Sequence, residues 1–232
     1  MRRLLTCLCG IAAAALVFAT GAPAQAQSRA PETTPVVFVH GFAGKGSQWW
    51  AMRRDFLANG YTEDQLHVFT YNSLRSNETS AERLAGFVDE VLATTGADRV
   101  DLVTHSMGGL PSRWYIRFLG GADRVDDWVS IGGPNNGTAV AGACFSLFTS
   151  CREMKRGSGF LSDLNADDPT PHGVNYVTFR SPCDLIISPI SSTALDGAAN
   201  HRTRCLEHIS MMWAPSVITS VRETISSPLI FD

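Results

Sequence analysis

The segment from Asp101 to Leu110 limits what this chain can fold into and do more than any other stretch of its sequence. It predicts a short apolar strand, then Ser106 in a tight turn, then two glycines that begin a helix. A serine hydroxyl is a weak nucleophile unless it is held clear of its own backbone and is given a base. A strand-to-helix turn places the serine oxygen at the tip of a sheet and directs backbone N–H groups at an anion that forms there. We therefore interpret Ser106 as a candidate nucleophile.

The residue two positions before this serine departs from the usual pattern. Turns of this kind typically read G-x-S-x-G, and Thr104 occupies the position of the first glycine. That position lies close to the following helix, so a small side chain is expected there. The alternative interpretation of Ser106 is a serine that only caps a helix after a parallel strand.

A second motif lies near the beginning of the chain. The apolar run from Pro35 to Phe42 predicts a strand that ends in His-Gly. In α/β-hydrolases the loop after such an early strand supplies one backbone N–H of the oxyanion hole, and the residue after the nucleophile supplies the other. In this chain those N–H groups would be the ones of Phe42 and Met107, and Gly41 would let the loop approach the substrate oxygen. Each such donor is typically worth ~3–4 kcal/mol of transition-state stabilisation.

The acid that supports a catalytic histidine follows the nucleophile in the chain order of α/β-hydrolases, and the histidine comes last. The alternating run Val174–Arg180 predicts a strand, and Asp184 comes just after its end. Asp196 is the second candidate, although Leu195-Asp196-Gly197 is also typical of a simple turn.

Two of the six histidines remain as candidates for the base, His208 and His201. His208 comes first, because it lies in a loop just before the amphipathic stretch at the carboxyl end. Three others, His40, His67 and His105, are expected to serve in packing or in shaping loops. His172 precedes the strand that leads to the acid, so the chain order argues against it.

Taken together, the V-x-V-H-G-F loop, the T-H-S-M-G-G turn and the later Asp and His resemble the lipase class 2 family, small secreted bacterial triacylglycerol lipases. The resemblance extends from about Pro35 to about Val221 and is looser between Thr138 and Asp168. It implies a single-domain α/β-hydrolase with a mostly parallel sheet and helices on both faces. It also implies a carboxylic ester hydrolase in which Asp184 and His208 match the family's acid and base.

The first 26 residues have the composition of a secretory signal peptide. A basic start at Arg2 and Arg3 precedes an apolar run from Leu4 to Phe18, and Ala24-Gln25-Ala26 fits a small-residue cleavage site. The apolar run is too short for a membrane anchor. We therefore expect residues 1–26 to be a signal peptide and residues 27–232 to be a secreted lipase domain. Loss of Arg2 and Arg3 takes the net charge from −3 to −5, which argues against nucleic acid as a partner.

Four cysteines remain in this expected mature chain, and an exported protein favours disulfides over zinc. Cys144 with Cys151 would close a small loop, while Cys183 with Cys205 would join the acid loop to the base loop. The spacings contain no C-x-x-C pair, which argues against a zinc site. We expect no metal ligand and no cofactor, although the sequence leaves a need for calcium open.

Helices and strands alternate along the predicted domain. Helices are expected at Gln48–Leu57 and from a capping box at Thr79 to Gly96, and strands at Val100–Val103 and Val125–Ile131.

The expected protein is a monomer that acts on lipids or other esters, with a lipid–water interface as one setting. A polyester (cutin-like) hydrolase or an acyltransferase would use the same residues. A non-catalytic secreted binding protein on a hydrolase scaffold is the alternative from another class, and it would be expected to lack the serine, acid or histidine.

Overall fold

The computed structural model describes residues 34–142 and 147–227, and these contain a sheet of six parallel strands. The strands run in the order β2-β1-β3-β4-β5-β6. Their bounds are β1 Val36–Val39, β2 Leu66–Phe69, β3 Val100–His105, β4 Val125–Ile131, β5 Asn175–Arg180 and β6 Ala199–Arg202. The expected mostly parallel sheet is confirmed.

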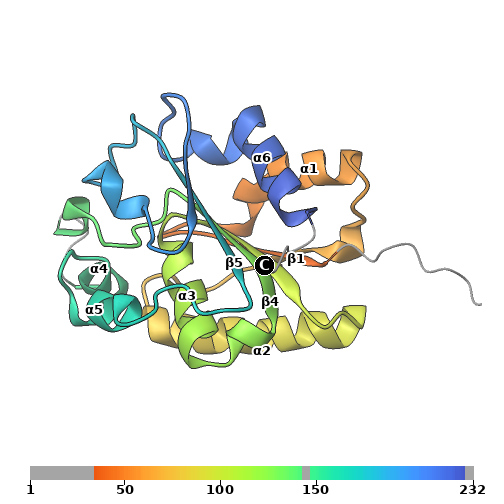
Figure 1. Cartoon of the computed structure of the whole chain (residues 1–232), viewed down its shortest axis with the longest axis horizontal. Coiled ribbons are helices and arrows are strands. Elements are labelled where there is room, and N and C mark those ends of the chain that lie inside the picture. Colours follow the sequence, from red (N-terminus) through yellow and green to blue (C-terminus); the bar gives the residue numbers. More distant parts are fainter. Residues whose placement is uncertain (1–33, 143–146, 228–232) are drawn as a thin grey trace, which may run out of the picture. The chain divides into compact units, whose positions relative to one another are not determined.

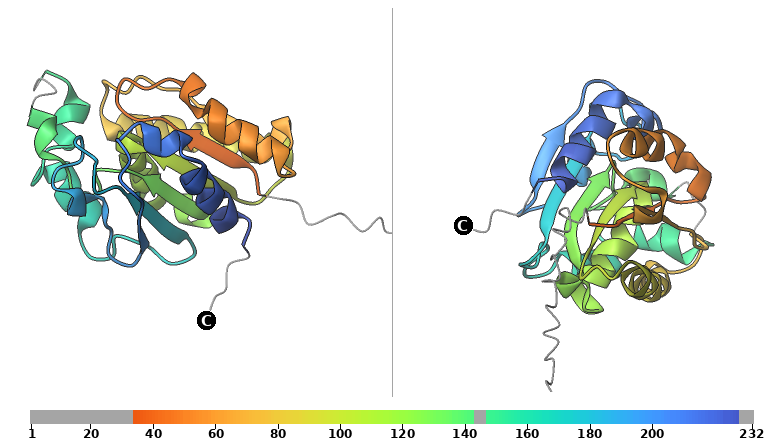
Figure 2. Two further views of the ribbon diagram at one scale, coloured as in Figure 1. Left: turned by 90° about the horizontal axis from the view of Figure 1, so that it is seen from above. Right: turned by 90° about the vertical axis from the view of Figure 1, so that its right-hand side faces the viewer.

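Helices cover both faces of this sheet, as Figures 1 and 2 show. Successive strand residues point to opposite faces. In β1, Val36 and Phe38 pack with the helices α1 (Trp50–Ala58) and α6 (Pro215–Ile225). Val37 and Val39 pack instead with α2 (Asn77–Thr95) and α3 (Gly109–Phe118). Because both of its faces are buried, β1 is a continuous apolar run, Val-Val-Phe-Val.

Two shorter helices, α4 (Thr149–Glu153) and α5 (Gly159–Asn165), belong to the segment between β4 and β5 and pack on the α2–α3 side. Single turns of 3-10 helix connect several elements, at Gly46–Trp49, Glu63–Gln65, Ser106–Gly108, Gly121–Asp123, Ala139–Gly142, Ile190–Thr193 and Ser210–Trp213.

The beginning of α2 differs from the sequence-based expectation. The helix begins at Asn77, and its N-cap is Ser76, whose hydroxyl accepts hydrogen bonds from the N–H groups of Glu78 and Thr79. The predicted capping box at Thr79 was therefore wrong, because an earlier serine already satisfies these N–H groups. The end of the helix at Gly96 is confirmed, and this glycine has the left-handed conformation (φ 73°) common at helix ends.

The strand order places a reversal in the middle of the sheet. From β1 the chain moves outward to β2, then returns to β3 on the other side of β1 and continues outward to β6. In open parallel sheets, ligands bind beyond the carboxyl ends of the strands that flank such a reversal. The loops after β1 and β3, which hold Phe42 and Ser106, meet at this point.

Candidate active site

The turn between β3 and α3 holds Ser106 in a strained conformation. Its φ is 54°, in the left-handed region that a non-glycine residue adopts only at an energetic cost. The turn is also crowded, since a Cβ atom at Gly108 would lie 2.5 Å from the carbonyl oxygen of Val39. Similarly, a Cβ atom at Gly41 would lie 2.7 Å from Cβ of Ser106. These glycines let the loop after β1 pack directly against the serine turn.

Thr104 is accommodated because the helix that follows begins with a second glycine. The Thr104 hydroxyl donates to the carbonyl oxygen of Val129 at 2.9 Å and is fully buried. A Cβ atom at Gly109 would lie 3.5 Å from this hydroxyl and 3.2 Å from that of Ser130. The turn therefore has room for the larger Thr104 side chain because Gly109, at the start of the facing helix, has no side chain.

A continuous chain of hydrogen bonds joins Ser106, His208 and Asp184. The distance from Ser106 Oγ to His208 Nε2 is 2.9 Å, and His208 Nδ1 lies 2.8 Å from Asp184 Oδ2. With the Nδ1 proton facing the carboxylate, Nε2 is free to accept the serine proton. All three side chains are buried, with 8%, 8% and 4% exposure for Ser106, His208 and Asp184. The structure thus brings together the three residues singled out from the sequence.

The surroundings of Asp184 keep its carboxylate charged. Its other oxygen accepts hydrogen bonds from the N–H groups of Ile186 (2.9 Å) and Ile187 (3.0 Å). Burial by itself raises the pKa of this carboxyl, but the hydrogen bonds and the charge of His208 outweigh it, so the pKa lies below its usual value. A charged Asp184 can orient the imidazole and stabilise its protonated form.

The two histidines of the sequence motifs lie beside this chain of hydrogen bonds but outside it. His105 Nε2 lies 3.1 Å from the carbonyl oxygen of His208, and the two rings are 4.7 Å apart. Burial and the charge of His208 lower the pKa of His105 to about 3. Neutral His105 therefore donates to the backbone of His208. His40 stacks on Tyr71 at 4.4 Å, and its carbonyl oxygen accepts the Tyr71 hydroxyl, which shapes the loop after β1.

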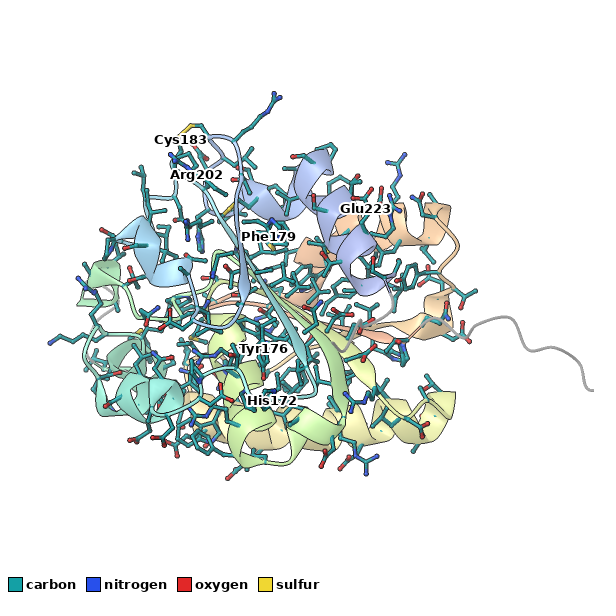
Figure 3. The ribbon with its side chains drawn as sticks, viewed as in Figure 1. His172, Tyr176, Phe179, Cys183, Arg202 and Glu223 are labelled. Atoms are coloured by element: carbon teal, nitrogen blue, oxygen red, sulfur yellow. A yellow bond between two sulfur atoms is a disulfide. The ribbon has the colours of Figure 1, made fainter. Side chains whose placement is uncertain are left out.

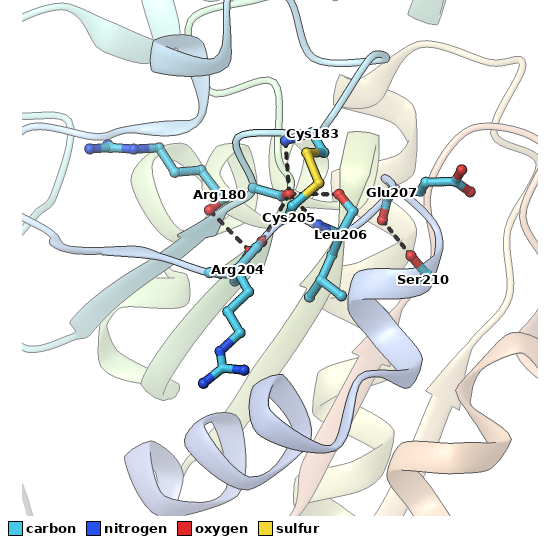
Figure 4. Close-up of a disulfide and its surroundings, with 9 residues drawn as sticks. Arg180, Cys183, Arg204, Cys205, Leu206, Glu207 and Ser210 are labelled. Carbon is cyan, nitrogen blue, oxygen red and sulfur yellow. Dashed lines mark hydrogen bonds between the residues drawn. A yellow bond between two sulfur atoms is a disulfide. The ribbon is translucent and has the colours of Figure 1, made fainter.

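The loops that hold the acid and the base are joined twice (Figure 4). The expected disulfide between Cys183 and Cys205 is present, with the Cα atoms 4.9 Å apart. Ser181 provides the second connection, because its hydroxyl donates to the carbonyl oxygen of Leu206 and accepts from the N–H of the same residue. The sequence motifs did not predict this role of Ser181. A serine just past a strand end and two residues before a cysteine is a weak signal by itself. The other expected pair, Cys144–Cys151, includes a residue outside the described part of the chain.

The rejected candidates for acid and base lie elsewhere. His201 is exposed on β6, where its ring stacks on Phe179 at 5.3 Å. Asp196 lies in a turn, and its carbonyl oxygen accepts from the Thr170 hydroxyl. Figure 3 shows His172 at the opposite end of β5 from Cys183. None of the three forms a hydrogen bond with Ser106 or His208 in the described residues.

An apolar cavity of about 250 Å³ opens beside Ser106. Its lining comes from the loop after β1, the segment between β4 and β5, and the acid loop, and comprises Phe42, Ser106, Thr138, Val140, Ala141, Met154, Ile186 and Ile187. Met107, the other expected oxyanion donor, is buried in the first turn after the serine. Among the described residues, no group of side chains suited to a metal ion includes a residue of this site.

The sheet and the serine turn at its reversal define an α/β-hydrolase fold, and solved structures share it. The mature form of Bacillus licheniformis lipase BlEst2 superposes with a TM-score of 0.73 at 18% identity, covering 86% of this chain and 94% of that one. Aspergillus fumigatus lipase B gives 0.69 at 18% identity, covering 84% and 53%. The fold expected from the sequence is confirmed.

The chain belongs to the class 2 lipase family, whose model matches residues 33–205. A triacylglycerol lipase of Burkholderia plantarii is 30% identical over 199 residues, which cover 83% of this chain and 50% of that protein. Another, of Pseudarthrobacter phenanthrenivorans, is 30% identical over 176 residues, which cover 73% and 49%. This chain thus spans about half the length of these curated relatives. The resemblance inferred from the motifs is confirmed, and the family match ends before His208.

Proposed function

We propose that this chain is a carboxylic ester hydrolase of the triacylglycerol lipase type, acting through an acyl-enzyme on Ser106. The observation that supports it most is the chain of hydrogen bonds from Ser106 through His208 to Asp184, beside an apolar cavity. Membership of the class 2 lipase family supports the same reaction.

In the proposed reaction, His208 Nε2 takes the proton of Ser106 Oγ as that oxygen attacks the ester carbonyl carbon. The imidazolium then gives this proton to the leaving alcohol as the C–O bond breaks, which leaves an acyl-enzyme. A water molecule repeats the sequence, with its proton passing to His208 and then to Ser106 as the carboxylic acid leaves. Asp184 stays ionised and stabilises the imidazolium, in keeping with its lowered pKa.

We assign the oxyanion hole to the backbone N–H groups of Phe42 and Met107. Phe42 lines the cavity next to Ser106, and Gly41 brings this loop against the serine. Met107 follows the nucleophile at the start of a helical turn, where N–H groups lack partners within the helix.

The cavity suggests the size of the acyl group. Pockets that enclose drug-sized ligands usually measure ~300–1,000 Å³, and this cavity of about 250 Å³ is smaller. We infer that it holds a short to medium acyl chain while the alcohol part lies outside. Hydrolysis of p-nitrophenyl esters of increasing chain length tests this, with Ser106→Ala as the control. A rate that rises steadily to the longest chains would contradict the inferred size, and product esters formed only with an added alcohol would indicate an acyltransferase.

We further propose that the protein is exported and that residues 1–26 are removed, leaving the domain 27–232. The first 33 residues lie outside the described part, but the Cys183–Cys205 disulfide is of a kind that persists in oxidising compartments. None of the described helices has the length and apolar character needed to cross a membrane. Amino-terminal sequencing of exported protein should begin at Gln27, and an intact Met1 would contradict the proposal.

A further inference from the structure

Three aspartates gather at the amino ends of β3 and β4, far from Ser106. The pairing of these strands shifts between Val100 and Leu102, so that Asp126 and Asp127 both lie opposite Asp101. Such a bulge changes the direction of neighbouring side chains, which in a regular strand point to opposite faces. As a result, one carboxylate oxygen from each of the three aspartates lies within 4.8 Å of the other two.

The two buried members of this cluster lack partners for part of their carboxylates. Asp101 is fully buried and Asp127 is 1% exposed, yet Oδ2 of each has no hydrogen-bond partner among the described residues. A buried carboxylate oxygen without a partner costs free energy unless a proton or a cation lies next to it. Burial and the neighbouring acids raise the pKa of Asp101 well above its usual value.

Where the structure describes basic side chains, none of them forms an ion pair with the cluster. Arg99 is the cation whose charge acts on Asp126, but its Nη1 donates to the carbonyl oxygens of Val125 and Gly173. Across residues 34–142 and 147–227, no lysine or arginine forms an ion pair with Asp101, Asp126 or Asp127.

We propose that Asp101, Asp126 and Asp127 bind one divalent cation of the class that prefers oxygen ligands. Such ions bind carboxylates at roughly 2.0–2.6 Å, so oxygens less than 5 Å apart can share one ion. A proton shared by Asp101 and Asp127 would leave the third carboxylate unused. Asp126 is half-buried and offers the ion both a third ligand and a route from solvent.

The cation would act on stability and not on the reaction. Ser106 lies five residue steps from Asp101 along extended chain, which is about 16 Å at roughly 3.3 Å per step. The site does not depend on the proposed function, because it contains none of the residues assigned to ester hydrolysis. The cysteine spacings, which argue against zinc, say nothing about a cation held by carboxylates. The bulge that places Asp126 and Asp127 opposite Asp101 depends on the pairing of two strands, so the sequence alone does not reveal it.

The test is thermal unfolding of the full mature chain after dialysis against EDTA, with CaCl₂, MgCl₂ or MnCl₂ added back. At a concentration about 100-fold above Kd, one of these ions should raise Tm by roughly 5–10 °C. Isothermal titration should give about one ion per chain. Ser106→Ala should show the same shift, which separates this test from the test of the activity.

Asp126→Asn is the decisive variant, because it removes the half-buried ligand and leaves the buried pair in place. It should abolish the rise in Tm, while Asp89→Asn, an exposed substitution on α2 with the same charge change, should keep it. If Asp126→Asn does not fold, Asp101→Asn replaces it in the same measurement. No ion-dependent shift in the unsubstituted protein, or a full shift in the variant, would overturn the proposal. The first result would indicate that Asp101 and Asp127 share a proton.

Discussion

The two ends of β3 differ in how their buried carboxylates are hydrogen-bonded. Beyond the carboxyl end, Asp184 accepts from Ile186, Ile187 and His208, and its pKa lies below the usual value. At the amino end, the N–H of Asp127 is the one donor to Asp101 within the described part of the chain, and the pKa of Asp101 lies well above the usual value. Both side chains are buried, so burial alone does not set the charge. The hydrogen-bond donors and the charges of the neighbouring groups decide it together: His208 favours a charged Asp184, while Asp126 and Asp127 disfavour a charged Asp101.

The carboxyl end of β3 thus has an acid whose charge is already balanced by its partners, as a catalytic site needs. The amino end has a cluster of acids without an ion-paired positive charge, among the described residues, to balance them. The acid at the candidate active site is ionised before substrate arrives, and a disulfide and a serine hold its loop. The cluster at the other end needs a proton or a cation to complete it. Substitutions at the first end should therefore change activity, and substitutions at the second should change stability.

The largest effect is expected for Ser106→Ala. Loss of the nucleophile of a Ser-His-Asp site typically lowers turnover about 10⁶-fold. The fold should persist, because the hydroxyl oxygen is a small part of a turn formed by the backbone. Ester hydrolysis by the purified variant is the measurement, with Asp126→Asn as the matched substitution at the other end, which should stay active. Retained activity in clean Ser106→Ala protein would contradict the proposed function.

The next largest effects are expected for Asp184→Asn and His208→Ala, each of which should lower turnover by about 10⁴-fold or more. The amide cannot stabilise a charged imidazole, and the alanine removes the base. His201→Ala and Asp196→Asn are the controls, since their side chains lie outside the hydrogen-bonded chain, and each should have a mild effect on kcat. An inactive His201→Ala beside an active His208→Ala would show that the base was wrongly assigned.

The sequence was sufficient for the parts of the site that depend on local order. Ser106, Asp184 and His208 could be singled out because each lies in a loop at a strand end, or before the last helix, in the chain order of this fold. The strand Val125–Ile131 was predicted with its observed bounds, because it is bounded by clear turn residues.

The sequence was insufficient where contacts join distant segments. Ser181 bonds to Leu206, 25 residues away, and no local pattern marks that pairing. The tolerance of Thr104 depends on Gly109, which faces it from the next helix. The bulge opposite Asp101 likewise depends on the register between two strands. These features arise from tertiary packing, which a periodic pattern does not encode.

Removal of the Cys183–Cys205 disulfide tests whether the acid and base loops need this covalent link as well as the Ser181 hydrogen bonds. Cys183→Ser with Cys205→Ser should lower the free energy of unfolding by roughly 2–4 kcal/mol. Turnover should fall by up to about 100-fold, because an ångström of slack loosens the His208–Asp184 hydrogen bond. Denaturant unfolding and kcat are the two measurements, and peptide mapping of unreduced protein checks the pairing. Unchanged kcat would mean that the Ser181 hydrogen bonds hold the loops by themselves, and adding Ser181→Ala should then lower it.

The smallest effect is expected at another buried carboxylate, Glu153, which accepts hydrogen bonds as Asp184 does but has a raised pKa as Asp101 does. Its Oε2 accepts from the backbone N–H and the side chain of Asn77, yet burial outweighs these hydrogen bonds and its pKa is raised. The folded state therefore holds this proton more tightly than the unfolded state, and stability falls as pH rises through the folded-state pKa. For Asp184 the pH dependence is reversed. Because its pKa is lowered in the folded state, its charged form stabilises the fold at pH values above the pKa of the unfolded chain, and this contribution is lost as the pH falls.

Glu153→Gln should keep an acceptor for Asn77 and remove the cost of burying a charge. Its Tm should match that of the unsubstituted protein near pH 4 and exceed it by a few degrees near pH 8, as expected for roughly 1 kcal/mol in a domain of this size. Asp184→Asn should show the reverse, with the largest loss of Tm at neutral pH and a shrinking loss below about pH 4, near the unperturbed aspartate value. Thermal unfolding of both variants from pH 4 to pH 8 checks the two signs together. If both differences changed with pH in the same direction, the opposite pKa shifts of Glu153 and Asp184 would be contradicted.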